Sequence, residues 1–95
     1  MRIGDIVISV CGHDMGEWYI VQDVLNDYVY LIDGKNKTVE KPKKKKIKHV
    51  IKTNHREDEI AKKLSSNQMV QNAEIRKAIK FSKTIVKENV CQKKM

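Results

Sequence analysis

The sequence predicts a mainly β protein with a helical extension, in which a small barrel or meander is followed by two helices. Three observations carry this prediction. All four glycines lie before residue 35, where turn residues separate short β-branched runs at close spacing. Beyond residue 53 the apolar residues recur at helical spacing instead. A chain of 95 residues also has room for only one compact domain. We expect this domain to cover residues 1–53, with a helical extension over residues 54–95.

Five strands are expected in the first 53 residues, because runs of β-branched and aromatic side chains are bounded there by glycine, proline and Asn or Asp turns. The expected strands cover residues 5–11, 17–25, 28–32, 37–40 and 47–52. Pro42 cannot donate a ladder hydrogen bond, so it marks a break before the last strand. In segment 17–25 both alternating faces are partly apolar, which is typical of a small closed barrel.

The first of the two expected helices is short. Ile60 and Leu64 fall on one side of it, and Thr53 or Asn54 is expected to cap its N-terminus. The sequence Ser65-Ser66-Asn67 is expected to end it.

The second expected helix runs from Asn72, as its cap, to about Glu88. Its apolar stripe, which would pack on the barrel or on a bound partner, contains Ile75, Ala78, Ile79, Phe81, Ser82, Ile85 and Val86. A neighbouring stripe is basic and consists of Arg76, Lys80, Lys83 and Lys87.

Charge is unevenly distributed along the chain. Residues 1–34 contain one base and six acids, whereas residues 35–56 contain ten bases and one acid. The whole chain has a net charge of +8 and a pI near 9.6. Such a balance favours a polyanionic partner, with nucleic acid ahead of an anionic membrane surface.

No feature of the sequence indicates catalysis. Nucleotide-binding, nucleophile-elbow and zinc-protease motifs are absent from it. Cys11 and Cys91 are too far apart for a local metal or redox pair, and Cys11 with His13 lacks a second pair at zinc spacing. We therefore expect no enzyme activity, cofactor, metal or small-molecule substrate. The sequence has neither a secretory signal nor a long apolar run, so a cytoplasmic protein is expected.

The segment Gly12-His13-Asp14-Met15-Gly16 lies between two expected strands, and its glycines suggest a tight loop with positive φ. From the residues alone this is a hairpin loop. Together with the flanking positions it resembles the KOW motif, and the residues that carry the likeness are Gly4, Val7, Val10, Gly12, Asp14, Gly16, Val21 and Val24.

The likeness extends beyond this motif. The residues that follow the motif, among them Val29, Leu31, Asp33 and Gly34, make the sequence similar to large-subunit ribosomal proteins of the eukaryotic and archaeal fourteen-e type. Small bacterial KOW proteins with the same lysine run and a short helical tail are also similar. The resemblance implies an SH3-like barrel and RNA binding, with ribosomal RNA as the partner and ribosomal proteins as further neighbours.

The loop departs from the family pattern, since Met15 and Glu17 stand where many members have basic residues. If this loop contacts RNA, it is expected to use His13 or the backbone N–H groups exposed by Gly12 and Gly16.

Lysine side chains are the main candidates for RNA contact, because flexible ammonium groups bind phosphate without a fixed geometry. The candidates are Lys35, Lys37, Lys41, Lys43, Lys44, Lys45, Lys46, Lys48, Lys52, Arg76, Lys80 and Lys83. A solvated basic linker and an ordinary exposed helix face are the simpler interpretations of these residues. Trp18, Tyr19, Tyr28 and Tyr30 are candidates for base stacking or for core packing.

The predicted function is non-catalytic RNA binding, associated with the large ribosomal subunit or its assembly. Two alternatives remain open. One is a protein interaction module of KOW type acting in transcription or translation. The acidic loop residues Asp14 and Glu17 favour this alternative. The other is non-specific binding to DNA.

Overall fold

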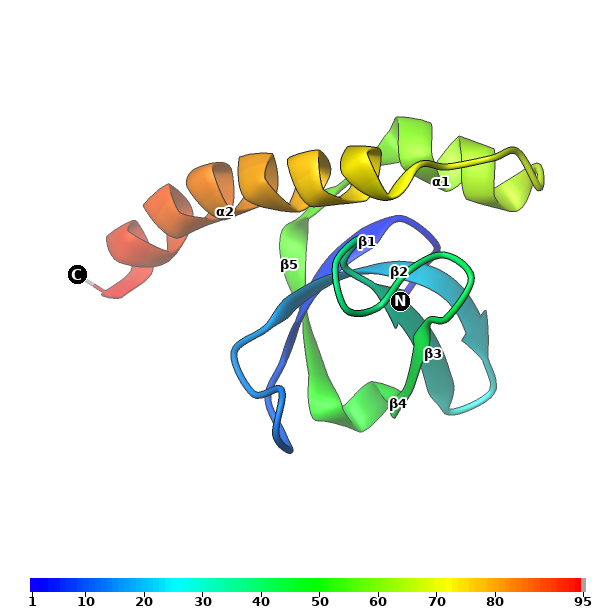
Figure 1. Cartoon of the computed structure of the whole chain (residues 1–95). Helices are drawn as coiled ribbons and strands as arrows, with labels where there is room; N and C mark the ends of the chain where they lie inside the picture. Colours follow the sequence, from blue (N-terminus) through cyan, green and yellow to red (C-terminus); the bar gives the residue numbers. More distant parts are fainter. Residues whose placement is uncertain (95) are drawn as a thin grey trace.

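The computed structural model describes the backbone of residues 1–94 and the side chains of residues 1–85. It contains one five-stranded antiparallel sheet, with two helices lying along one side of it (Figure 1). The strands are β1 (Asp5–Ser9), β2 (Trp18–Leu25), β3 (Tyr28–Ile32), β4 (Lys43–Lys46) and β5 (Val50–Arg56). The remaining elements are the 3₁₀-helix η1 (Ile47–His49) and the helices α1 (Asp58–Ser65) and α2 (Asn72–Lys94). The prediction of a mainly β protein with a helical extension is confirmed.

The strand order is β4-β3-β2-β1-β5, so that β4 and β5 form the two edges of an open sheet. β1 pairs antiparallel with β2, β2 with β3, and β3 with β4. β4 does not pair with β5, and η1 joins these two edge strands along the chain. The chain then returns through β5, which pairs with β1. The edges of the sheet are therefore connected directly by a short helical turn.

The expected strand over residues 37–40 is wrong, because the chain turns there instead. Asp33 Oδ1 accepts hydrogen bonds from the backbone N–H groups of Lys35 and Lys37, at 2.8 and 2.9 Å. This side chain satisfies backbone donors that a strand would need for its ladder. The fourth strand is instead the lysine run, β4, which pairs with β3 from Tyr28↔Lys46 to Leu31↔Lys43.

A β-bulge in β2 changes which face its side chains occupy. The pairing with β3 shifts between Val21 and Asp23, leaving Gln22 as the extra residue. Before the bulge, Tyr19 and Val21 lie on one face, and after it Val24 packs with the same cluster. Strict alternation along residues 17–25 would place Val24 on the face of Trp18 and Ile20, and the bulge moves it to the other face.

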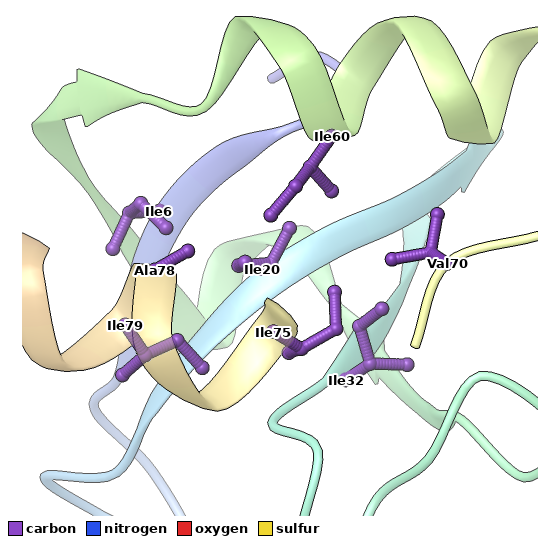
Figure 2. Close-up of a cluster of buried hydrophobic side chains, with 8 residues drawn as sticks. All are labelled: Ile6, Ile20, Ile32, Ile60, Val70, Ile75, Ala78 and Ile79. Carbon is purple, nitrogen blue, oxygen red and sulfur yellow. The ribbon is translucent and has the colours of Figure 1, made fainter. Parts of the chain in front are cut away.

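Apolar side chains cover both faces of the sheet. The first cluster lies between the sheet and the helices, as Figure 2 shows. Ile6, Ile20 and Ile32 come from three neighbouring strands, and Ile60 of α1 and Ile75 of α2 pack against them. The cluster also contains Val70, Ala78 and Ile79.

The second cluster lies on the opposite face and consists of Val7, Tyr19, Val21, Val29, Leu31 and Val50. Residues of β3 and β5 pack in this one cluster although two strands separate them, so the sheet must curve strongly around it. Successive residues of a strand point to opposite faces, which explains why Ile6 and Val7 enter different clusters.

Helix α1 begins later than the expected caps indicate. Strand β5 continues to Arg56, and Thr53 is a buried strand residue whose Oγ1 donates to the carbonyl of Ile6 at 2.7 Å. Glu57 stands at the N-cap without a side-chain hydrogen bond to the helix. The expectation that Thr53 or Asn54 caps the helix is therefore wrong.

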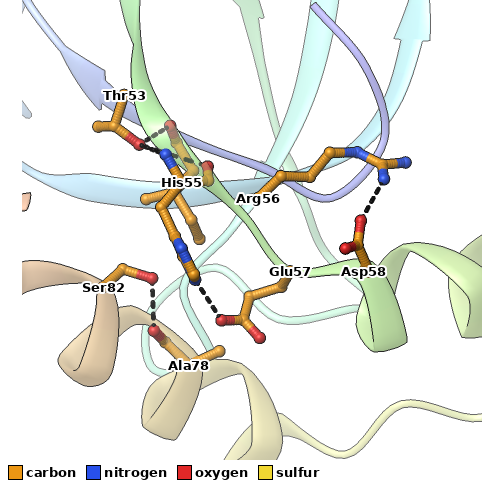
Figure 3. A network of polar contacts seen from close by, with 8 residues as sticks. Thr53, His55, Arg56, Glu57, Asp58, Ala78 and Ser82 are labelled. Atoms are coloured by element: carbon orange, nitrogen blue, oxygen red, sulfur yellow. Dashed lines mark hydrogen bonds and ion pairs between the residues drawn. The ribbon is translucent and has the colours of Figure 1, made fainter. Parts of the chain in front are cut away.

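Polar contacts join the end of β5 to the start of α1 (Figure 3). His55 Nε2 lies 2.6 Å from Glu57 Oε1, and Arg56 Nη1 donates to Asp58 Oδ1 at 2.6 Å. The His55 ring also meets the Phe81 ring edge to face, with centroids 6.0 Å apart. These contacts fix the direction in which the chain leaves the sheet.

Helix α2 covers the sheet with the side that the sequence predicts. Ile75, Ala78, Ile79 and Ser82 are buried, and Ser82 Oγ donates back to the carbonyl of Ala78 at 2.8 Å. Phe81 departs from the prediction, because its side chain is 57% exposed beside His55. The side chains of Val86 and Lys87 lie outside the described residues.

Two glycines allow the helices to approach the sheet closely. A Cβ atom on Gly4 would lie 2.5 Å from the Cβ of Ala61 in α1. On Gly34 it would lie 2.4 Å from the carbonyl oxygen of Asn72 in α2. Both glycines also have positive φ, at 93° and 77°, which other residues rarely adopt. Each helix thus packs against a glycine that lies just outside a strand, Gly4 before β1 and Gly34 after β3.

Candidate nucleic-acid interface

The loop between β1 and β2 is a closed hairpin loop rather than an open phosphate cradle. Gly12 and Gly16 have φ of 89° and 90°, as the sequence predicts. The N–H of Gly16 donates to the carbonyl of Ser9 at 2.8 Å, so this group is already used within the loop. Met15 N–H donates to the carbonyl of Gly12. His13 is exposed and remains accessible.

Asp14 is the centre of a polar cluster that attaches this loop to β4. Its carboxylate accepts from Lys45 Nζ at 2.8 Å and from Ser9 Oγ at 2.9 Å. Tyr19 OH donates to the other oxygen at 3.1 Å, and Lys43 Nζ lies 3.3 Å from the same oxygen. We call the group Ser9, Asp14, Tyr19, Lys43 and Lys45 the Asp14 cluster.

The Asp14 cluster shifts the pKa values of both of its acids. Burial alone would raise the pKa of Asp14, but the donors of the cluster, led by Lys45, together hold it well below its usual range. Burial, and next the negative charge of Asp14, raise the pKa of the Tyr19 phenol above its ordinary value. At neutral pH the cluster therefore contains an ionised carboxylate beside a protonated phenol.

The lysine run is divided into two faces because it forms a strand. Lys43 and Lys45 point to Asp14, and the Lys45 side chain is only 9% exposed. Lys44 and Lys46 are exposed on the alternate positions. Two of the four lysines are therefore paired with a carboxylate, and the local negative charge of the loop is neutralised by them.

The exposed lysines of this region form a small basic surface that we call the β4 patch, made of Lys44, Lys46 and Lys48. Lys44 Nζ lies 4.4 Å from the centroid of the Tyr28 ring, in a cation–π contact. Lys46 and Lys48 line a shallow hollow together with Asp27, Tyr28 and Ile47. This patch combines positive charge with an aromatic ring.

A second basic surface is a groove between α2 and the loop that follows β3. We call it the α2 groove; its volume is about 350 Å³, and it is lined by Glu17, Trp18, Asp33, Lys35, Arg76, Ile79, Lys80 and Lys83. Arg76 Nη1 donates to the carbonyl of Gly34 at 2.6 Å, which fixes the helix against this loop. The structure thus brings Lys35 together with the basic stripe of α2, although more than forty positions separate Lys35 from the first residue of that stripe.

The remaining candidate lysines lie outside both surfaces. Lys37 and Lys41 belong to the connection between β3 and β4, where Lys37 is half-buried. Lys52 is exposed on the edge strand β5.

Two acidic residues of the α2 groove were not expected in an RNA site. Glu17 and Asp33 belong to the acidic front of the sequence, and only the fold places them beside the bases of α2. Trp18 was expected as a stacking or core residue; it is half-buried, packs against the first cluster and lines the groove. Charge pattern along the chain could not reveal this mixture.

Within the part of the chain that the structure describes, no three His, Cys, Asp or Glu side chains gather to hold a metal ion. None of the helices in that part is both long and apolar enough to cross a membrane. Comparison with protein-family models and with curated proteins found no match to this chain.

Proposed function

We propose that this protein binds RNA without catalysing a reaction, and that it acts in the cytoplasm on the large ribosomal subunit or its assembly. The observation that carries the proposal is the α2 groove, where Arg76, Lys80 and Lys83 of one helix meet Lys35 from a distant loop. Several cations converging beside a half-buried indole suit a nucleic acid, which offers both phosphates and flat bases.

We further propose that the sheet belongs to the SH3-like barrels of KOW type. Support comes from the strand order, from the position of η1 between the edge strands, and from the glycine loop that joins β1 to β2. The strong curvature around the second cluster also favours a barrel.

The mechanism is electrostatic. Lysine and arginine side chains of the α2 groove and the β4 patch neutralise phosphates and release condensed counterions. RNA presents 2′-hydroxyls and unpaired bases rather than a readable major groove, so the rigid sheet sets the register while the cations supply affinity. Affinity should therefore fall steeply as salt is raised.

A charge reversal tests the proposal. Lys80→Glu/Lys83→Glu should weaken binding to large-subunit ribosomal RNA about tenfold or more and flatten the salt dependence. Lys62→Glu/Lys77→Glu is the matched control, because both of its lysines are exposed on helices outside the α2 groove and the change in net charge is the same. Filter binding over a range of salt concentrations provides the measurement. Equal losses in the two variants would mean that net charge alone, and not the groove, attracts RNA.

The reversal avoids Lys43 and Lys45 for a structural reason. Replacing either with Glu would set a second carboxylate against Asp14 and damage the fold as well as the surface. Sedimentation of a cell extract through a sucrose gradient then tests the ribosomal partner, which is expected to carry the protein in the large-subunit fractions at low salt.

A protein interaction module is the second candidate function. Met15 is 66% exposed and Val10 is 38% exposed on or beside the β1–β2 loop, where an apolar partner surface could contact them. Met15→Ser should leave RNA binding intact, whereas it should weaken docking if the loop is the functional surface. The acidic character of the loop supports this candidate less, because Lys43 and Lys45 neutralise Asp14.

A further inference from the structure

We propose that the α2 groove holds one unpaired guanine of the bound RNA, with Trp18 as its stacking surface and the Glu17 carboxylate as the acceptor for its Watson–Crick edge. This inference rests on the proposed RNA-binding function and adds to it the class of nucleotide that the groove selects.

The dimensions and walls of the groove suit a single nucleotide. Its volume of about 350 Å³ falls at the lower end of the range for small-ligand pockets. The indole of Trp18 and the aliphatic side chain of Ile79 supply apolar surface within it. A flat base gains from stacking on such a ring, and stacking of this kind is the usual way in which proteins hold splayed-out bases.

The mixture of charges distinguishes a base from a phosphate. A site for phosphate alone gains nothing from carboxylates, which repel it, yet Glu17 and Asp33 both line the groove. Carboxylates are useful where the ligand presents N–H donors. The cationic side chains of Arg76, Lys80 and Lys83 can contact the phosphates on either side of a nucleotide. The nucleobase of that nucleotide would then contact the carboxylates.

Of the two acids, Glu17 is the one that can read the base. Asp33 already uses Oδ1 to hold the turn through the N–H groups of Lys35 and Lys37. Glu17 is exposed, lies directly before β2 and lines the groove together with Trp18. Because the carboxylate and the indole line the same groove, Glu17 can meet the edge of a base that stacks on Trp18.

Guanine is the base that fits a carboxylate best. Its N1–H and N2–H donors lie side by side and match the two oxygens of one carboxylate, in the same bidentate manner as a guanidinium. Adenine and cytosine present an amino group next to an acceptor, and uracil presents a single imino donor between acceptors. Because this edge is occupied in a duplex, the guanine must be unpaired, as in a bulge or loop.

The chain contains a single tryptophan, so its fluorescence reports on the groove alone. The probes are an RNA hairpin with one bulged guanosine, the same hairpin with a bulged uridine, and the fully paired hairpin. We expect the bulged guanosine to quench Trp18 emission and to bind about tenfold more tightly than the bulged uridine. Affinities are measured in parallel by anisotropy of end-labelled RNA.

Glu17→Gln gives opposite results under the two interpretations of the groove. If Glu17 reads guanine, the variant loses the preference for guanosine and binds the guanosine bulge more weakly. If the groove holds only phosphate, removal of a negative charge strengthens binding of all three hairpins equally, and the inference is overturned. Glu40→Gln is the matched control, since Glu40 is exposed outside the groove and the charge change is identical.

The outcomes separate this inference from the proposed function. Binding of all three hairpins with equal affinity and unchanged Trp18 emission would overturn the guanine site and leave RNA binding in place. If none of the hairpins and no ribosomal RNA bound, the proposed function would fail, and the guanine site with it. Quenching by the guanosine bulge that Glu17→Gln abolishes supports both.

Discussion

Replacing Asp14 with Asn tests whether Lys43 and Lys45 stabilise the fold through their ion pairs with this carboxylate. The substitution keeps the shape of the side chain and removes the negative charge that Lys43 and Lys45 meet. It leaves the ammonium of Lys45, whose side chain is 9% exposed, beside a neutral amide. The loop between β1 and β2 then loses both ion pairs with β4 and keeps the hydrogen bond from Lys45 Nζ to the Cys11 carbonyl.

The magnitude follows from the exposure of the two ion pairs. The pair with Lys45 is short and largely buried, and a charge-assisted hydrogen bond of this kind contributes about 1.5 kcal/mol. The pair with Lys43 is longer, at 3.3 Å, and more exposed, so it contributes about 0.5 kcal/mol. Together they predict a loss of about 2 kcal/mol, which lowers the melting temperature by roughly 8 to 16 °C for a domain of this size.

Urea denaturation at pH 7, followed by circular dichroism, measures the loss. Asp23→Asn is the control, because Asp23 is exposed and its carboxylate accepts only from the adjacent N–H of Val24 among the described residues. The control should change the unfolding free energy by less than about 0.5 kcal/mol. An Asp14→Asn protein that unfolds at the same urea concentration as the control would refute the role assigned to the cluster.

The difference between wild type and Asp14→Asn should also depend on pH. The folded-state pKa of Asp14 lies below its ordinary value of 3.8, so its contribution is complete above that pH. It is lost as the pH falls from there through the folded-state pKa. The two proteins should therefore differ by a constant amount from pH 7 to pH 5 and converge in stability in strong acid.

Three other substitutions test two separate features of the fold. Gly34→Ala should cost about 3 kcal/mol, because its Cβ would overlap the carbonyl of Asn72 at a φ of 77°, as measured by urea denaturation. Gly16→Ala, at a φ of 90° in open space, should cost only about 1 kcal/mol, and equal costs would contradict the close approach of α2. In an alkaline absorbance titration the wild type should retain one phenol that ionises well above pH 10.0, because burial and the charge of Asp14 raise the pKa of Tyr19. Tyr19→Phe should remove this late step. In the wild type, the stability that the protonated Tyr19 phenol contributes is complete below pH 10.0 and is lost as the pH rises through the folded-state pKa of Tyr19.

The sequence predicts those elements of the fold whose signal is local. β3 coincides with its expected bounds, β1 and β2 lie within theirs, and α2 begins within one residue of its expected start, with Asn72 as its first residue instead of its cap. Each has a clear period and turn residues at its ends, and local spacing is sufficient to find it. The same is true of Gly12 and Gly16, whose positive φ follows from the tight turn between two strands.

The lysine run shows what local spacing cannot reveal. Four identical residues have no alternation, so the sequence indicates neither that β4 is a strand nor which lysines face Asp14. The pairing with β3 decides both, and it does so through residues more than ten positions away. The segment 37–40 contains the β-branched residues Thr38 and Val39, yet the side chain of Asp33 holds the preceding backbone in a turn.

The candidate site was predictable only in part, for a related reason. Helical spacing places Arg76, Lys80 and Lys83 along one stripe, and this stripe does line the groove. The contribution of Glu17 and Trp18 depends on how α2 crosses the sheet, which is set by the contact between Gly34 and Asn72. Tertiary packing of this kind leaves no mark in the period of either segment.

The shared core of sheet and helices has a consequence for how the chain is made. Ile6, Ile20 and Ile32 have been synthesised long before Ile75 and Ile79, which cover them in the finished fold (Figure 2). A nascent chain that stops after β5 therefore exposes an apolar face of its sheet to water and to chaperones. Because domains fold as units, the sheet gains its cooperative stability only once the first three turns of α2 have left the ribosome.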